Sequence, residues 1–172
     1  MNTIPKNSEM FYSEKQNFIS LKKTVLIVFV LLICTPLFAQ ISYKEINSSN
    51  LSSVRKLKIK LPKNYDPSSE IMYPLIIVFD GDYLFEPIAG QVDFQTYFDD
   101  MPSSIIVGVV QGSDRRYDGY CDEVTGLPKE SGLRFHNFVA QELIPYLEEN
   151  YNLSKFKIAV GHDLMGNFIN SF

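Results

Sequence analysis

The residues best suited to chemistry in this sequence lie in the segment Gly161-His-Asp-Leu-Met-Gly166. The segment follows the apolar stretch Phe156–Val160 and precedes a helical pattern that begins at Leu164. A glycine-bounded turn between a strand and a helix holds its middle residue exposed, which is how a Gly-x-Ser-x-Gly nucleophile elbow presents its serine. Here the middle residue is Asp163, so the sequence predicts an elbow that presents a carboxylate.

The rest of the sequence predicts the sheet that would position this turn. Continuous apolar runs over Leu75–Phe79 and Ile105–Val110 are typical of parallel strands covered on both faces. Over Lys56–Leu61 lysines alternate with apolar residues, which indicates a half-buried strand near a sheet edge. Helices are expected over about residues 87–97 and 131–150, the second bent by Pro145. Strands alternating with helices favour an α/β fold with a mostly parallel sheet flanked by helices.

Three stretches of the sequence resemble the putative-esterase family of α/β-hydrolases, which includes S-formylglutathione hydrolases, enterochelin-type esterases and feruloyl esterases. Tyr73–Asp82 is similar to the family's strand and oxyanion loop, and Phe138–Tyr151 to its helix before the elbow. Gly161–Gly166 aligns with the family pattern Gly-His-Ser-Leu-Gly-Gly. The similarity spans about Val54–Phe172, so the resemblance implies an α/β-hydrolase-like sheet that is truncated after the nucleophile elbow.

The resemblance also implies roles for individual residues. The catalytic position of the elbow is Asp163, framed by Gly161, His162, Met165 and Gly166. One backbone N–H of the oxyanion hole would come from Gly81 or Asp82 and the other from Leu164. Arg116 and Asp118 resemble an Arg…Asp pair in a loop of the family.

Two interpretations of Asp163 follow. Haloalkane dehalogenases and epoxide hydrolases resemble this arrangement, with an aspartate nucleophile whose ester intermediate is hydrolysed with the help of a downstream histidine. The only histidines here are His136 and His162, both upstream of Asp163, and attack on a carboxylic ester would give an anhydride. Aspartate is also among the best residues to cap the N-terminus of a helix. We therefore expect Asp163 to act as a helix cap.

The departures from the family pattern decide the functional expectation. Asp163 stands in place of the serine, Met165 in place of a small residue, and the sequence ends before a downstream acid and histidine. We expect an exported carboxylic-ester hydrolase by family, impaired in catalysis. The alternative is a non-catalytic exported remnant or a binding module.

The first 39 residues predict a secretory signal peptide. Lys22 and Lys23 precede the apolar run Thr24–Cys34, and Ala39 is the small residue before the expected cut. A bilayer span needs about 20 apolar residues, so an uncleaved membrane anchor is the alternative. The expected organisation is a signal peptide over 1–39, a linker over 40–53 and a partial esterase-like domain over 54–172, in a periplasmic or secreted protein.

Composition limits the partners of the exported part. Without residues 1–39 the chain has 12 basic and 18 acidic residues, a net charge of −6, which argues against a nucleic-acid partner. Cys121 would be its only cysteine, and we predict no metal site and no cofactor. We interpret the loop carboxylates Asp80, Asp82, Asp99 and Asp100 as solvated.

The expected partner of an active chain is a small-molecule ester, with no stable membrane association after cleavage. Because the strand that ends at Val160 would have an exposed edge, we also expect self-association through that edge.

Overall fold

The computed structural model describes Lys23 and residues 41–172. The chain separates into two units, 1–38 and 39–172. Apart from Lys23, the predicted signal peptide, with its apolar run, lies outside the described residues. Among the residues that are described, no helix has both the length and the apolar character needed to cross a bilayer.

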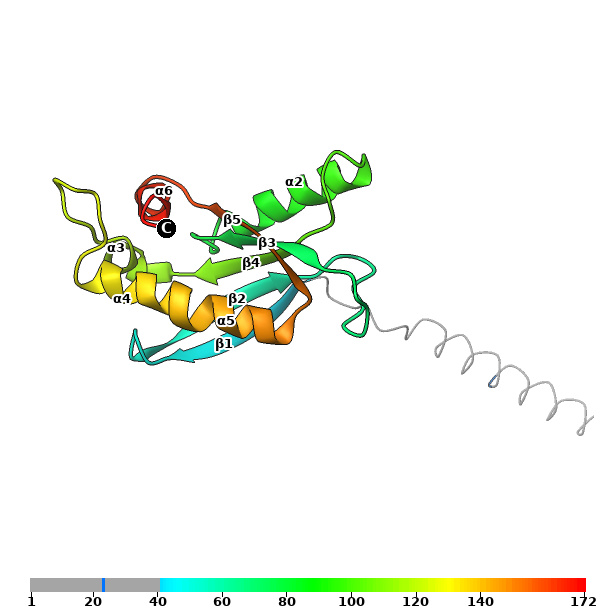
Figure 1. The fold of residues 1–172 in the computed structure, drawn as a ribbon, viewed down its shortest axis with the longest axis horizontal. Helices are drawn as coiled ribbons and strands as arrows, with labels where there is room; N and C mark the ends of the chain where they lie inside the picture. The colour runs from blue at the N-terminus through cyan, green and yellow to red at the C-terminus, as the bar shows by residue number, and fades with distance from the viewer. Residues whose placement is uncertain (1–22, 24–40) are drawn as a thin grey trace, which may run out of the picture. The chain divides into compact units, whose positions relative to one another are not determined.

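A five-stranded sheet forms the centre of the fold (Figure 1). Its strands are β1 (Ile41–Ser48), β2 (Ser53–Lys60), β3 (Tyr73–Val78), β4 (Ile105–Val110) and β5 (Leu153–Val160), in the spatial order β1-β2-β4-β3-β5. The β4-β3-β5 half is parallel, whereas the pairs β1-β2 and β2-β4 are antiparallel. The predicted α/β class is confirmed, with a mixed sheet in place of a mostly parallel one.

The segment predicted as a linker over residues 40–53 is largely a strand. β1 pairs with β2 along its whole length, from Ile41 opposite Lys60 to Ser48 opposite Ser53. The linker prediction was wrong because β1 is an edge strand with most of its side chains in water, so it shows no alternation of apolar residues. Its stability comes from backbone hydrogen bonds to β2, which consequently lies one strand inside the edge.

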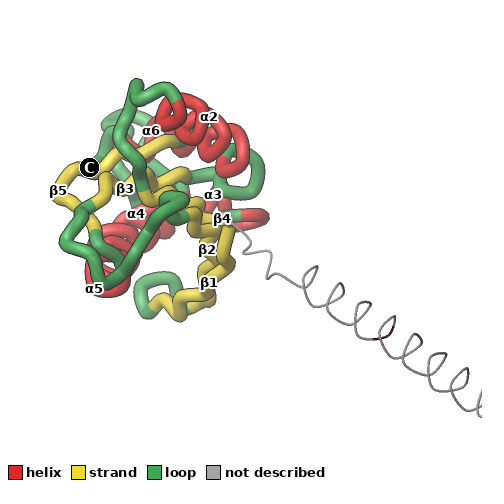
Figure 2. Tube along the Cα trace, turned by 90° about the vertical axis from the view of Figure 1, so that its right-hand side faces the viewer, coloured by secondary structure: helices red, strands yellow, loops and turns green. Residues whose placement is uncertain are grey.

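The helices cover both faces of the sheet. They are α2 (Phe85–Tyr97), α3 (Arg115–Asp118), α4 (Ser131–Asn137), α5 (Ile144–Asn150) and α6 (Leu164–Ile169), with the 3-10 turn η1 (Gly112–Asp114) and the π-helical segment η2 (Phe138–Leu143). Alternate residues of β3 face opposite layers: Leu75 and Ile77 pack with α4, α5 and α6, and Ile76 and Val78 pack with α2. Figure 2 shows the sheet between α2 on one side and α4 and α5 on the other.

The long helix predicted over residues 131–150 is continuous but irregular. Its middle part, η2, is π-helical, and Pro145 follows in the first turn of α5. Proline has no N–H to donate and its ring crowds the carbonyl four residues earlier. A wider turn before Pro145 relieves that crowding, so the predicted bend appears as a local change of helix type.

At the other edge of the sheet, β5 pairs only with β3. Its second edge has no partner strand among the described residues, and Phe156 in its middle is 62% exposed. β5 leads directly to the candidate site.

Candidate functional site

The turn between β5 and α6 has the backbone of a nucleophile elbow. Asp163 lies at its centre with φ 53° and ψ −113°, a conformation that costs a non-glycine residue about 1–3 kcal/mol. Gly161 lets α6 approach the strand, because a Cβ there would lie 2.9 Å from the backbone carbonyl of Met165. The Gly-bounded turn predicted from the sequence is therefore present, with Asp163 at its apex.

The side chain of Asp163 does not cap the helix that follows it. Asp163 occupies the N-cap position of α6, but its carboxylate makes no capping hydrogen bond. Capping requires an extended backbone that turns the side chain back toward the first N–H groups of the helix, and a φ of 53° prevents this. The expected cap was wrong for that reason. The carboxylate is 75% exposed, and its Oδ2 lies 4.0 Å from Nη1 of Arg115.

The loop after β3 faces the elbow. Gly81 donates its N–H to the carbonyl of Val109 at 2.9 Å, and a Cβ on this glycine would lie 2.8 Å from the same oxygen. The N–H groups of Asp82 and Leu164 have no acceptor among the described residues. Of the two loop residues predicted to supply an oxyanion-hole amide, Asp82 is the one whose N–H is not already bound.

Arg115 joins this loop to the elbow. Its Nε and Nη2 donate to the two carboxylate oxygens of Asp80, at 2.5 and 3.2 Å, and Nη2 also donates to the carbonyl of His162 at 2.9 Å. The hydrogen bond to Asp80 raises the pKa of Arg115. The resemblance indicated Arg116 for this region, but Arg116 is exposed and forms no ion pair in the part of the chain that the structure describes. The neighbouring arginine has the structural role.

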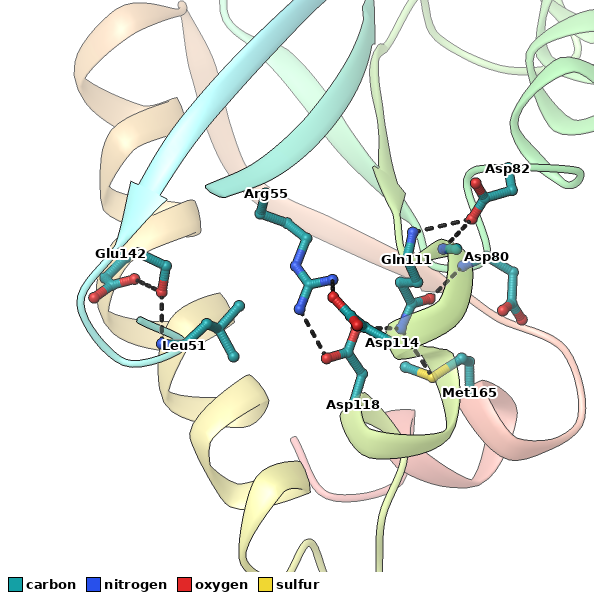
Figure 3. Close-up of polar contacts among 11 residues, drawn as sticks. Leu51, Arg55, Asp80, Asp82, Gln111, Asp114, Asp118, Glu142 and Met165 are labelled. Carbon is teal, nitrogen blue, oxygen red and sulfur yellow. Dashed lines mark hydrogen bonds and ion pairs between the residues drawn. The ribbon is translucent and has the colours of Figure 1, made fainter. Parts of the chain in front are cut away.

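A buried polar cluster lies behind the loop (Figure 3). Gln111, the first residue after β4, accepts the N–H of Asp80 and donates to Asp118. Asp118 also accepts from Arg55 of β2 at 2.9 Å. Burial raises the pKa of Asp118 to about 6, because removal from water disfavours its charged form by more than Arg55 favours it. Sequence reasoning missed Gln111 and Arg55, and the only signal for Gln111 was its place at the end of an apolar strand.

Met165 fits the elbow through a specific contact. The sequence marked it as a departure because it replaces a small residue. In the structure its side chain is fully buried, and Sδ accepts a hydrogen bond from Nε2 of Gln111 at 3.3 Å. A flexible thioether fills the space between helix and strand and supplies a weak acceptor.

The two histidines lie in different surroundings. Nδ1 of His162 is 3.4 Å from the hydroxyl of Tyr83, a contact between the elbow and the facing loop. Desolvation, followed by the hydrogen bond and charge of Asp80, raises the pKa of Tyr83. His136 on α4 stacks on Phe172, with ring centroids 4.3 Å apart, and within residues 41–172 it has no hydrogen bond or ion pair with Asp163.

The prediction that the loop carboxylates are solvated was wrong for Asp80, whose side chain is 1% exposed because it lies against Arg115, whereas Asp99 and Asp100 are exposed. Asp80 pairs with Arg115, and Oδ2 of Asp82 accepts the N–H groups of Gln111 and Gly112. Within residues 41–172, no three His, Cys, Asp or Glu side chains gather in a metal-binding arrangement.

Sequence comparison identifies the family. The family described as "Putative esterase" matches residues 48–168 of the chain. This chain belongs to the Putative esterase family. No curated protein sequence matched it.

Solved structures support the same fold. An uncharacterised protein from Capnocytophaga ochracea DSM 7271 is 30% identical, with a TM-score of 0.68 over 74% of this chain and 34% of its own. An IroE-like serine hydrolase from Shewanella oneidensis is 26% identical, with a TM-score of 0.65 over 74% and 44%. The BES protein from Bacillus cereus is 26% identical, with a TM-score of 0.64 over 80% and 60%. The chain therefore spans between about a third and three fifths of the length of these proteins.

Proposed function

We propose that this chain carries the acyl-ester site of an exported esterase-type hydrolase, and that ester hydrolysis at this site is impaired because Asp163 occupies the elbow. The observation that carries the proposal is the strained turn at Asp163 together with the N–H groups of Asp82 and Leu164, which have no acceptor among the described residues. This turn presents a carboxylate in place of a serine. Membership of the Putative esterase family supports the reaction type.

The chemistry of Asp163 explains the impairment. A serine alkoxide that attacks an ester yields a new ester of similar energy, whereas a carboxylate yields an anhydride, which lies higher in energy. Arg115, 4.0 Å from the carboxylate, stabilises the negative charge that attack would have to disperse. Both effects act against Asp163 as a nucleophile toward carboxylic esters.

The remaining parts of the site suit an oxyanion. The N–H groups of Asp82 and Leu164 come from two facing segments and have no acceptor among the described residues. Such donors stabilise the negative oxygen of a tetrahedral intermediate. We infer that a serine at position 163 would have this support.

An acylation experiment tests the proposal. The full chain and the variants D163S and D163N are incubated with p-nitrophenyl acetate and with a fluorophosphonate, and labelling is read by intact mass and peptide mapping. We expect covalent labelling only in D163S, at position 163, because this variant alone places a hydroxyl nucleophile at the elbow. Binding and an oxyanion hole retain about 10³–10⁴-fold acceleration over water when a triad member is lost, which would support the reaction. D163N is the matched control, which removes the charge without adding a nucleophile.

Two outcomes would change the interpretation. Turnover by the unmodified chain that D163N abolishes would identify Asp163 as a working nucleophile. A D163S variant that folds but stays unlabelled would favour the alternative, a non-catalytic binding module or remnant, since the site would then be unable to support acylation.

The exported location is part of the proposal and rests on the sequence alone. Protein recovered from the periplasm or the medium should begin near Gln40 or Ile41. Recovery of the chain from membranes with its first residues intact would instead support the anchored alternative.

A further inference from the structure

The side-chain amide of Gln111 lies where three parts of the site meet. Oε1 accepts the N–H of Asp80, in the loop after β3, at 2.8 Å. Nε2 donates to Oδ2 of Asp118 at 3.0 Å and to Sδ of Met165, in α6, at 3.3 Å. All three contacts are buried, and Gln111 itself is 3% exposed. One amide group therefore contacts the oxyanion loop, the helix after the elbow and the buried carboxylate.

The chemistry of its partners fixes the orientation of this amide. A backbone N–H can only donate, so the group facing Asp80 must be the oxygen of Gln111. A carboxylate can only accept, so the group facing Asp118 must be the NH₂. Turning the amide over would place donor against donor and acceptor against acceptor in a buried environment, where each unmade hydrogen bond costs about 1–3 kcal/mol.

The loop that Gln111 contacts needs support. Asp80 has a φ of 58°, which is unfavourable for a residue other than glycine. Gln111 reaches the loop a second time through its backbone, because its N–H donates to Oδ2 of Asp82 at 3.0 Å. The side chain of Gln111 thus contacts the start of the loop, and its backbone N–H contacts the side chain of Asp82 two residues later (Figure 3).

We propose that Gln111 is the positioning residue of this site, whose amide sets the loop at Asp80–Asp82 and the helix at Met165 in the register that an oxyanion requires. This inference rests on the proposed function, because it assigns the loop and the elbow to one acyl-ester site. Gln111 does not touch a substrate. It acts through the backbone of Asp80 and the side chain of Met165.

The hydrogen-bond pattern allows a test by exchange of partners. In Q111E the new carboxylate still accepts from Asp80, but its second oxygen faces the carboxylate of Asp118. In D118N the side chain has one NH₂ group, which must face either Gln111 or Arg55. Both of these residues already donate toward position 118, so one contact becomes donor against donor. In the double variant Q111E/D118N the hydrogen bond between side chains 111 and 118 forms again with donor and acceptor exchanged. The net charge of the chain is unchanged. Only the contact to Met165 loses its donor.

Two readouts follow the variants. The first is hydrogen exchange of peptides covering residues 80–84, with peptides from α2 as the internal control. The second is the rate of fluorophosphonate labelling in the D163S background. We expect Q111E to accelerate exchange at 80–84 and to slow labelling by about tenfold or more, since small displacements of a reacting group cost up to about 10²-fold. The double variant should recover most of both effects.

The outcomes separate this inference from the proposed function. If D163S is never labelled, the proposed function fails. Even then, loss of protection from hydrogen exchange at residues 80–84 in Q111E, with recovery in the double variant, would support Gln111 as the residue that positions the loop. If D163S is labelled and Q111E slows it with no recovery in the double variant, or with no change at 80–84, Gln111 is not a positioning residue. Urea unfolding of each variant shows whether it is folded under the assay conditions.

Discussion

Two helices of this protein begin with the same unusual backbone. Glu130 precedes α4 with φ 48° and ψ −106°, and Asp163 precedes α6 with φ 53° and ψ −113°. Neither side chain caps its helix, and both residues are exposed. The backbone of the elbow is therefore not unique to the candidate site.

The two turns differ in what faces them. At the Glu130 turn the neighbouring backbone is already paired: Lys129 donates to the carbonyl of Tyr120 at 3.1 Å, and a Cβ on Gly132 would lie 1.9 Å from the same oxygen. At the Asp163 turn the facing loop includes Asp82, whose N–H has no acceptor in the part of the chain that the structure describes, and Arg115 lies beside the turn. A strained helix start lets a helix approach neighbouring backbone closely. It becomes a candidate reaction site only where that backbone also supplies free donors.

The turns also differ in what precedes them, a loop before Glu130 and a strand before Asp163, and this difference gives the largest expected effect, a change of assembly state. The Asp163 turn follows β5, an edge strand with an unpaired side and with Phe156 exposed. We expect the purified chain to form dimers or larger species through this edge. F156K should shift sedimentation toward monomer, whereas F94K, at a similarly exposed aromatic of α2, should not. A monodisperse monomer from the unmodified chain would contradict the expectation.

Arg115 contacts the Asp163 turn and, in the part of the chain that the structure describes, forms no side-chain hydrogen bond or ion pair at the Glu130 turn, so its removal should have the largest effect on stability. R115M leaves the side chain of Asp80, which is 1% exposed, without its ionic partner. Breaking a buried pair from one side costs about 3–5 kcal/mol, and because the Arg115 side chain is 29% exposed we expect about 3 kcal/mol in urea unfolding. R116M is the matched control and should change the free energy of unfolding by less than about 0.5 kcal/mol. Equal changes in the free energy of unfolding for R115M and R116M would show that Arg115 has no special structural role at the site.

We expect Asp118 to make the loop facing the elbow sensitive to pH. Its pKa is raised to about 6 in the folded chain, so the folded state holds a proton on this group more tightly than the unfolded state does. The resulting stability is fully present below about pH 4 and is lost as the pH rises through about 6, an effect of about 2–3 kcal/mol.

The contribution of Asp118 is measured as a difference. Urea unfolding of the unmodified chain and of D118N is compared between pH 4 and pH 7.5, so that the titration of other groups cancels. Because Gln111 connects Asp118 to the loop, exchange at residues 80–84 should follow the same pH range, while exchange at 130–134 should not. A parallel response at both turns would show that the coupling is not specific to the elbow.

The features that the sequence predicted are those encoded by neighbouring residues. The elbow was predictable because Gly161 and Gly166 bracket Asp163 within a few residues of a strand, and the central strands because their apolar runs are continuous. Gln111 was not predictable, since its partners Asp80 and Met165 lie 31 and 54 residues away and meet only in the folded sheet. β1 was missed because an exposed edge strand needs no apolar face. The expected cap at Asp163 failed because residue preference carries no information about a φ of 53°.

The smallest expected effect compares the two strained residues directly. Glycine adopts positive φ without a Cβ penalty, so D163G and E130G should both relieve strain. Relief of about 1–3 kcal/mol is partly offset by the larger conformational freedom of glycine in the unfolded chain, about 0.5–1 kcal/mol. We expect each variant to gain about 1 kcal/mol in the free energy of unfolding.

The gains in the free energy of unfolding of D163G and E130G should differ by the contribution of one ion pair. Asp163 has Arg115 at 4.0 Å, an exposed ion pair worth at most about 1 kcal/mol, while Glu130 has no ion pair among the described residues. E130G should therefore gain slightly more than D163G. D163N separates the two contributions, because it removes the charge and keeps the strained backbone, so it should lose the small ion-pair term and gain nothing. If neither glycine variant is stabilised, the two turns are not strained and the comparison between them loses its physical basis. If D163G gains more than E130G, the carboxylate of Asp163 is itself unfavourable where it lies, which would strengthen its identification as a residue out of place in a site built for a serine.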